Sequence, residues 1–371
     1  MTMATSFPRL GALAPTAILV GAAAAASVGN RPDTITRVAS LSVARAAHTA
    51  TTLPTGRVLI AGGMGPGGGS LASAEVYDPA TNGIQVIGRM AESRSGHSAT
   101  RLPDGRVIIA GGYNGEYLRS VEVFDPSRNT FRAGGTLGQE RSGHTATLMP
   151  DGRILFVGGV GSGWTFLRSA EIYDPATGRS DLVGTMLAAR ESHTATLLAD
   201  GRVLVAGGHQ GRRQNMEVFA SVELFDPATL RFAPAGTMAL PRHKHDAVRL
   251  TDGRVLIIAG ADRTDRAHYP STEIYDPQTG RFTSGPPMHH PRYKISGTSI
   301  LLETGEVLVT SGAVAAELLD ARGTGFREVP GRLPQAYRFA TASLTPGGDV
   351  IIIGGYSDDN SNTAGVWRFT R

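Results

Sequence analysis

The residues of this chain best suited to chemistry lie close together in the sequence, between positions 209 and 294. The chain has ten histidines, and five of them stand in this region outside a repeated slot: His209, His243, His268, His289 and His290. Basic residues and phenols share the same stretches: Arg212, Arg213, Lys244, Arg263, Arg266, Tyr269, Arg292, Tyr293 and Lys294. Neutral imidazoles can bind a metal, and a cluster of cations can bind an anion. A His or Tyr beside Arg can also act as base or acid in β-elimination from a uronate. The region therefore leaves three kinds of site open.

One segment in this region departs from a pattern that recurs along the chain. The copies RAAHTAT, RSGHSAT, RSGHTAT and RESHTAT begin at residues 45, 94, 141 and 190, and each has one Arg and one His among mostly small residues. The fifth copy, PRHKHDAV, adds His243 and Lys244 and has Asp246 where the others have Thr or Ser. We expect the repeated His to be structural, because five equivalent residues cannot all be catalytic. The departures of the fifth copy mark it as a candidate site.

A repeat of about fifty residues positions these segments. Runs of β-branched residues followed by small ones end at Gly63, Gly112, Gly159, Gly208, Gly260, Gly312 and Gly355, at intervals of 49, 47, 49, 52, 52 and 43 residues. Each copy predicts a short strand, a turn that is Asp-Gly in most copies, a buried strand, a variable stretch, a third strand such as AEVYDP and a fourth such as RFAPAGTM. Four antiparallel strands make one propeller blade, so the sequence predicts an all-β propeller.

Seven copies of the first three strands predict seven blades. The last copy, at 340–370, ends before a fourth strand, whereas TITRVASL at 34–41 matches the fourth-strand position. The N-terminal strand is therefore expected to complete the last blade and close the ring, which removes open sheet edges. The third strand of blade six, at 316–320, is degenerate. Six blades are therefore the alternative.

The pattern ARxxHTAT…DGRV…AGG…EVYDP across blades one to five resembles the kelch family, and most closely the seven-bladed central domain of galactose-oxidase-like proteins. The resemblance covers nearly all of the chain after the leader. It implies a fold more than a function, because kelch propellers include oxidases, lyases, epimerases and binding modules. The Tyr–Cys radical cofactor of galactose oxidase is not possible here, since the chain has no cysteine. We make no other prediction of a cofactor or metal.

Antiparallel order predicts which face of the propeller is functional. The stretch after strand two and the link between blades share one face, and this face has the variable sequence. Two roles stay open for the repeated Arg: pairing with the repeated Glu between blades, or contact with an acidic ligand at the mouth of the channel. The first role needs no ligand, and the second would surround the channel with cations.

The ends and the bulk composition of the chain indicate its compartment and class. Residues 10–27 form an apolar, Ala-rich run that resembles a secretory signal, so we predict a signal peptide at 1–26 and a single domain at 27–371. No later segment is apolar enough to span a membrane. The formal charge is +4, and Arg residues are spread along the chain, which argues against a nucleic-acid partner. The expected location is secreted or periplasmic.

We predict an exported recognition module for an acidic small molecule, glycan or extracellular protein. The alternative is a carbohydrate-active enzyme, either metal-dependent or a uronate lyase that uses His or Tyr with Arg. The candidate catalytic residues are His243, His289 and Tyr293. The candidate ligand-binding residues are His209, Arg212, Arg242, His243, Lys244, His245, His268, His290 and Arg292.

Overall fold

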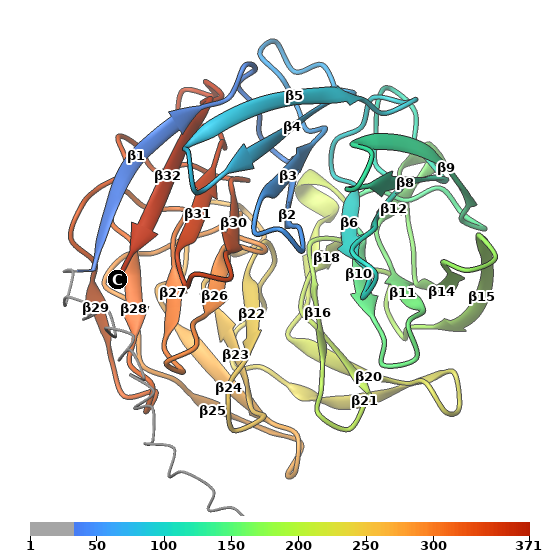
Figure 1. Cartoon of the computed structure of the whole chain (residues 1–371). Coiled ribbons are helices and arrows are strands. Elements are labelled where there is room, and N and C mark those ends of the chain that lie inside the picture. Colours follow the sequence, from blue (N-terminus) through green and yellow to red (C-terminus); the bar gives the residue numbers. More distant parts are fainter. Residues whose placement is uncertain (1–32) are drawn as a thin grey trace, which may run out of the picture. The chain divides into compact units, whose positions relative to one another are not determined.

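The second strand of each repeat forms the core of its blade. These strands consist mostly of Val, Ile and Leu, and both of their faces are buried, as expected for strands inside a packed sheet. They are Val58–Ala61 (β3), Val107–Ala110 (β7), Ile154–Val157 (β11), Val203–Ala206 (β17), Val255–Ile258 (β23), Val307–Val309 (β27) and Val350–Ile353 (β31). The computed structural model describes residues 33–371, and there it contains seven four-stranded antiparallel sheets around one axis (Figure 1). The seven-bladed prediction is confirmed, and the six-bladed alternative is wrong.

The first strand of each blade lies nearest the axis (Figure 1). These inner strands are Thr49–Thr52 (β2), Ser98–Arg101 (β6), Thr145–Leu148 (β10), Thr194–Leu197 (β16), Asp246–Arg249 (β22), Ser299–Leu301 (β26) and Thr341–Leu344 (β30). The third strands are Ser73–Asp78 (β4), Ser120–Asp125 (β8), Ser169–Asp174 (β14), Ser221–Asp226 (β20), Thr272–Asp276 (β24), Glu317–Leu319 (β28) and Gly365–Thr370 (β32).

The outer strands are the most exposed, and one of them comes from the other end of the chain. They are Gly83–Arg89 (β5), Thr130–Thr136 (β9), Arg179–Thr185 (β15), Arg231–Thr237 (β21), Arg281–Ser284 (β25), Phe326–Glu328 (β29) and Thr34–Ser40 (β1). Strand β1 pairs with β32, from Thr34 opposite Thr370 to Ser40 opposite Gly365. The ring is therefore closed by the N-terminal strand, as predicted. The predicted signal segment at 1–26 and the predicted domain start at residue 27 lie outside the described residues.

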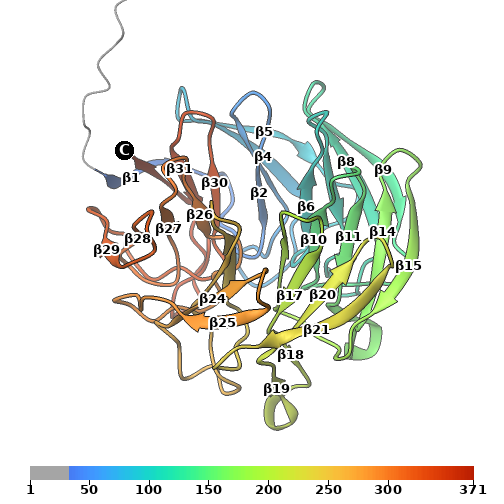
Figure 2. The ribbon, with the colours of Figure 1, turned by 90° about the horizontal axis from the view of Figure 1, so that it is seen from below.

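Two small hairpins extend the stretches after strand two in blades three and four. The first pairs Val160–Gly161 (β12) with Thr165–Phe166 (β13) around the 3-10 turn Ser162–Trp164 (η1). The second pairs His209–Gln210 (β18) with Glu217–Val218 (β19) around the 3-10 turn Arg213–Asn215 (η2), and it projects from its blade (Figure 2). Among residues 33–371, neither helical turn nor any other helix has the length and hydropathy to cross a membrane.

A ring of backbone hydrogen bonds surrounds the axis on the face that has the links. One residue of each link has a left-handed backbone: Ala47, Gly96, Gly143, Ser192, Lys244, Lys294 and Phe339. At six of the seven steps, its N–H donates to the carbonyl of the equivalent residue in the preceding blade, over 2.8–3.2 Å. The last of these bonds, from Ala47 to Phe339, joins the first blade to the seventh. Seven residues, two of them glycines, therefore occupy equivalent positions around the axis.

Asp246 replaces a hydroxyl residue because the blade that follows it has lost its histidine. In the other copies this hydroxyl contacts the repeated His of the next blade, but in blade six Ile295 stands in the place of that His. The Asp246 carboxylate instead accepts the backbone N–H groups of Gly297, Thr298 and Ser299, over 2.8–3.1 Å. Ala259 then occupies the site of the first glycine of the pair, since no imidazole packs there. Asp246 is therefore a local repair of the repeat.

This repair can be tested by restoring the repeat residues. Asp246→Thr should lower the free energy of unfolding by about 2–4 kcal/mol, because three buried amides lose their acceptor. Adding Ile295→His and Ala259→Gly rebuilds the contact that other blades have, so the triple variant should recover part of the loss. Denaturant unfolding measures both variants. Equal losses in the single and triple variants would contradict this explanation.

Candidate functional site

The repeated arginine side chains lie inside the blades and not at the mouth of the channel. Six arginines are 0% exposed: Arg45, Arg94, Arg141, Arg190, Arg242 and Arg292. Each donates to a third-strand carboxylate over 2.5–2.9 Å, respectively Glu75, Glu122, Glu171, Glu223, Glu273 and Glu317. Arg242 and Arg292, predicted to bind ligand, are thus closed off from solvent. Ion pairing within the fold accounts for the repeated Arg and Glu.

The repeated histidines connect neighbouring blades. Their Nε2 atoms lie 2.9–3.1 Å from a hydroxyl of the preceding blade, in the pairs His48–Thr341, His97–Thr49, His144–Ser98, His193–Thr145 and His245–Thr194. Burial lowers the pKa of His97 and of His193 to about 3, so these rings are neutral. His245, another predicted ligand residue, is 0% exposed and belongs to this set.

The structure separates the remaining predicted residues into two groups. His289 and His290 lie beside β28 and β29, where His289 contacts Glu317 over 2.9 Å and His290 contacts Glu328 over 2.7 Å. His268 stacks on Tyr293, with ring centroids 3.8 Å apart. Tyr293 itself is buried. Neither group lines the hollows at the mouth of the channel, whereas His209, Arg212 and Lys244 do.

Two adjoining hollows of about 440 and 450 Å³ lie at the mouth of the channel. They share the lining residues Trp164, Glu191, Ser192 and Phe339, and we call them together the channel cavity. The first reaches the links of blades one to three, and the second reaches His209, Arg212, Arg213 and Lys244. The cavity therefore lies on the loop-bearing face, as the sequence predicted, but it is centred on earlier blades than expected.

Small link residues make room for the channel cavity. Ala47, Gly96 and Gly143 line it from blades one to three. Gly143 has φ +64°, and a Cβ there would lie 2.5 Å from Oε1 of Glu191. The glycine therefore both permits the left-handed backbone and leaves space for this carboxylate.

An aromatic wall borders the cavity on blades two and three. The rings of Tyr113 and Tyr117 are 5.1 Å apart, and the ring of Trp164 stands edge-on to Tyr117 at 5.6 Å. Trp164 is 49% exposed. Such a wall suits a ligand with apolar faces as well as polar groups.

Cations stand next to this wall. The guanidinium of Arg212 lies over the Trp164 ring, and the exposed Arg213 is its neighbour in the chain. Lys244 lines the cavity from blade five, and its Nζ lies 2.5 Å from Oδ2 of Asp265. The cavity thus has an aromatic side and a basic rim.

A chain of titratable groups leads from the cavity into the protein. Oε2 of Glu191 lies 3.5 Å from Nε2 of His209, and Nδ1 of His209 lies 3.1 Å from Nδ1 of His243. Nε2 of His243 is 2.9 Å from Oδ1 of Asp265 and 3.1 Å from the carbonyl oxygen of Asp262. His209 is 4% exposed and His243 is 0% exposed. We call this series the Glu191 chain.

The protonation states along the Glu191 chain follow from burial and charge. Burial raises the pKa of Glu191 to about 7, although Lys244 and Arg212 oppose the shift. Burial, with the nearby His243 and Lys244, lowers the pKa of His209 to about 3. Burial acts to raise the pKa of Asp265, but hydrogen bonds from His243 and Lys244 outweigh it, so the net shift is downward. Near neutral pH, Glu191 is thus half protonated, while Asp265 is ionised.

Sequence reasoning missed Glu191 and the aromatic wall. Glu191 stands in the slot where the first three blades have Ala46, Ser95 and Ser142, so the departure was visible in RESHTAT. Trp164 is one of only two tryptophans and lies in a variable stretch on the predicted face. Both departures can be read in the sequence. The directions of the side chains, which bring these residues to one cavity, cannot be read there.

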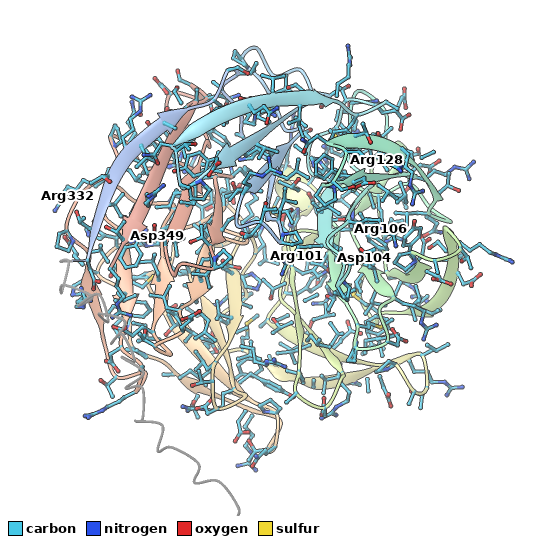
Figure 3. All side chains as sticks on the ribbon, in the orientation of Figure 1. Arg101, Asp104, Arg106, Arg128, Arg332 and Asp349 are labelled. Carbon is cyan, nitrogen blue, oxygen red and sulfur yellow. The ribbon has the colours of Figure 1, made fainter. Side chains whose placement is uncertain are left out.

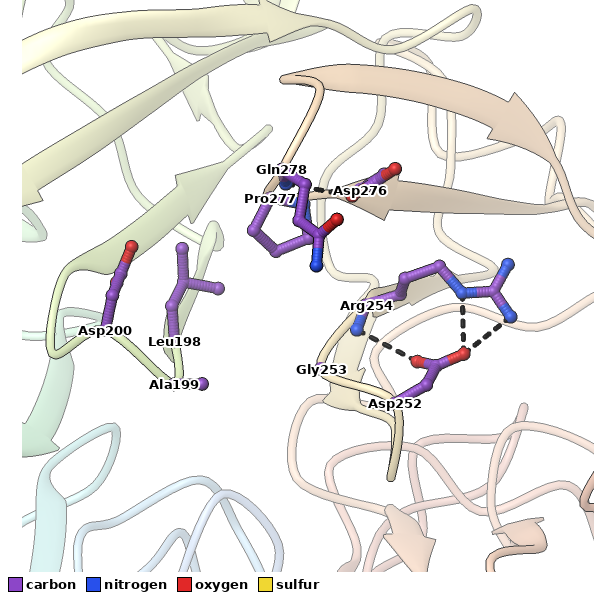
Figure 4. Close-up of a pocket in the computed structure, with 9 residues that line it drawn as sticks. All are labelled: Leu198, Ala199, Asp200, Asp252, Gly253, Arg254, Asp276, Pro277 and Gln278. Atoms are coloured by element: carbon purple, nitrogen blue, oxygen red, sulfur yellow. Dashed lines mark hydrogen bonds and ion pairs between the residues drawn. The ribbon is translucent and has the colours of Figure 1, made fainter.

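A hollow of about 550 Å³ on the opposite face belongs to the scaffold. It lies between the turns of blades four and five and is lined by residues such as Asp200, Arg254 and Pro277 (Figure 4). The repeated turns make a similar hollow between blades two and three, near Asp104 and Arg106 (Figure 3). We therefore attribute these hollows to the repeat. Over residues 33–371, no group of three or more His, Cys, Asp or Glu is placed to hold a metal ion.

The buried ion pairs should behave differently from exposed pairs in the same blade. Arg242→Met and Glu273→Leu should each lower the free energy of unfolding by about 3–5 kcal/mol, because the remaining charge is buried alone. The double variant should lose less than the sum of the two. Arg254→Ala, which breaks the exposed pair with Asp252, should cost no more than about 1 kcal/mol. Equal losses for Arg242→Met and Arg254→Ala in urea unfolding would refute the buried role.

The shifted carboxyl group should make stability depend on pH. Because the pKa of Glu191 is about 7 in the folded chain and 4.5 ordinarily, the folded state binds more protons between these values. The free energy of unfolding therefore falls as pH rises from about 4.5 to 7. Glu191→Gln should match the wild type at pH 4 and exceed it by about 1–3 kcal/mol at pH 8. A stability difference that is the same at both pH values would show that Glu191 is not shifted.

The comparisons with known proteins agree with this architecture. Residues 93–138 match the family described as Kelch motif. A solved fungal alcohol oxidase of the AA5 family, in complex with copper, is similar in structure, with a TM-score of 0.69 and 16% sequence identity over 91% of this chain and 75% of that chain. No curated protein matches the chain. The seven closed blades, the kelch motif at residues 93–138 and the shared fold show that this chain is a seven-bladed β-propeller with a kelch motif and the fold of the solved AA5 alcohol oxidase.

Proposed function

We propose that this propeller recognises an acidic carbohydrate in the channel cavity. The observation that carries the proposal is the pairing of an exposed aromatic wall with a basic rim in one hollow. Trp164 and Tyr117 supply aromatic contact for a sugar ring, and the exposed Arg212, which lies over the Trp164 ring, and Arg213 supply cations for its carboxylate. The volumes of about 440 and 450 Å³ are in the usual range for small-ligand sites. A sugar acid fits these groups better than a flat protein partner would.

We propose that the protein acts outside the cytoplasm, secreted or periplasmic, because the apolar run at 10–27 resembles a secretory signal. Detection of the chain with a new N-terminus near residue 27 in the exported fraction would support this part of the proposal.

A second candidate function, a metal-free uronate lyase, is favoured by Glu191. Its carboxylate would take the proton from the carbon next to the sugar carboxylate, and the C–H electron pair would form the C=C bond. The neighbouring C–O bond would break, and its oxygen would receive the proton that Glu191 returns. Arg212 would pair with the sugar carboxylate, a role that sequence reasoning gave to Arg in general. Glu191 replaces Tyr293 as the candidate base, because Tyr293 is buried under His268.

Binding of polygalacturonate, alginate and hyaluronan oligomers tests the main proposal. Trp164→Ala should weaken binding by about tenfold through lost ring contact, and Arg212→Ala should weaken it and reduce its salt dependence. His289→Ala is the matched control, since His289 lies beside β28, and it should bind like the wild type. Isothermal titration calorimetry gives each affinity. Binding to none of the three oligomers, or binding that Trp164→Ala leaves intact, would refute recognition in this cavity.

A further inference from the structure

The contact between His209 and His243 admits only one proton. Their two Nδ1 atoms are 3.1 Å apart. Two N–H groups at this distance would clash, and two bare nitrogens would repel, so one ring must donate to the other. Both rings are almost fully buried. The protonation states of the two histidines are therefore linked.

The far end of the pair fixes one of these protons. Nε2 of His243 faces the ionised carboxylate of Asp265 and the carbonyl oxygen of Asp262, and both can only accept. Nε2 of His243 therefore carries a hydrogen. The near end faces the cavity, where Nε2 of His209 points to Oε2 of Glu191.

Two arrangements of three protons satisfy every contact. In the first, Glu191 is protonated and faces the bare Nε2 of His209 over 3.5 Å, and Nδ1–H of His209 donates to Nδ1 of His243. In the second, Glu191 is ionised and faces Nε2–H of His209, and Nδ1–H of His243 donates to Nδ1 of His209. The second places an imidazolium of His243 against Asp265. The two forms differ by two short proton shifts and have the same net charge.

We propose that Glu191, His209 and His243 form a proton relay, with Asp265 as its anionic end, which makes Glu191 a reversible proton donor and acceptor toward a sugar in the channel cavity. The proposal rests on the proposed function for the identity of that ligand, and it deepens the lyase reading. No redox partner or co-reactant is needed, since the relay only stores and returns a proton. His209 and His243 act through Glu191 and are positioning residues, and only Glu191 reaches the cavity as acid or base.

Other charged groups around Glu191 define the relay's environment. Tyr117 faces it from blade two, Arg212 from the β18–β19 hairpin, and Lys244 from the link of blade five. The two cations favour the ionised form of Glu191, whereas burial favours the neutral form. Lys244 pairs with Asp265 and also lies near Glu191. A change in the charge of Asp265 therefore alters the electrostatic potential at both ends of the Glu191 chain.

Ring nitrogen NMR of the whole chain tests the relay without any ligand. In the wild type at a fixed pH, the 15N shifts of His209 and His243 should report one shared equilibrium, in which a hydrogen on Nε2 of His209 is matched by a hydrogen on Nδ1 of His243. In Glu191→Gln, the amide can donate permanently to Nε2 of His209, so His209 should carry its hydrogen on Nδ1 and His243 on Nε2. Glu217→Gln, in the hairpin that contains His209 but outside the cavity, should behave like the wild type.

Two outcomes would overturn the relay. One is that the two rings report different populations of the two forms, and the other is that Glu191→Gln leaves both rings as they are in the wild type. If Glu191→Gln fails to fold, Asp265→Asn serves instead, and there the second form should be lost, because His243 no longer faces a carboxylate. Failure of the proposed function looks different: the oligomers would not bind, while the shared equilibrium of the two rings would persist.

Proton exchange with a ligand is the second readout. Titration of polygalacturonate oligomers into the wild type near pH 7, in buffers of different ionisation enthalpy, should reveal a proton taken up or released on binding. Glu191→Gln should bind with no proton exchange. Equal proton exchange in both proteins would refute the role of Glu191, even if binding itself is intact.

Discussion

The buried arginine–glutamate pair is the interaction on which the rest of this propeller depends. In blade one, Arg45 donates to the carbonyl of Gly62 and to Glu75, and the second oxygen of Glu75 accepts the N–H of Ser42. One guanidinium thus fixes the link, the end of the second strand and the third strand at once. Blade seven shows what the pair can be exchanged for: Tyr337 and Trp367 take the two positions, with ring centroids 5.2 Å apart. A buried ion pair and an apolar pair are both workable solutions at such a site.

Because the scaffold uses the repeated Arg, Glu and His, function must come from departures from the repeat. Not every departure is functional, however. Asp246, Ile295 and Ala259 differ from their equivalents in other blades, yet they compensate for one another across a single blade junction. No other departure in the repeat compensates for Glu191 or His243. Both side chains lie next to His209, at the edge of the channel cavity. A departure that leaves a titratable group facing a cavity is the more informative kind.

The sequence predicted the fold almost completely because each strand could be checked against six other copies, and the closing strand β1 could be recognised by the copy it completes. The candidate site was predicted in part. His209, Arg212 and Lys244 do line the channel cavity, since topology alone brings their segments to one face. Arg242 and His245 lie in the same link as Lys244, but their side chains are buried inside the blades. The direction in which a link side chain points cannot be predicted from the spacing of the repeat. Trp164 and Glu191 come from a variable stretch of blade three and the link of blade four, and the directions of their side chains cannot be predicted from the spacing of the repeat.

The position of the cavity follows from one ring of equivalent residues. The backbone ring gives every blade the same starting point near the axis, and the side chains there decide where space remains. Ala47, Gly96 and Gly143 leave it open on one side, whereas Lys244, Lys294 and Phe339 fill the other. Lys294 is itself occupied, since its Nζ lies 2.5 Å from the Tyr356 hydroxyl and close to the Phe339 ring. The blades that supply the hollow are therefore not those that supply most of its charge. A symmetric backbone thus acquires an asymmetric cavity, because small residues on one half leave open the space that the charged groups of the other half line.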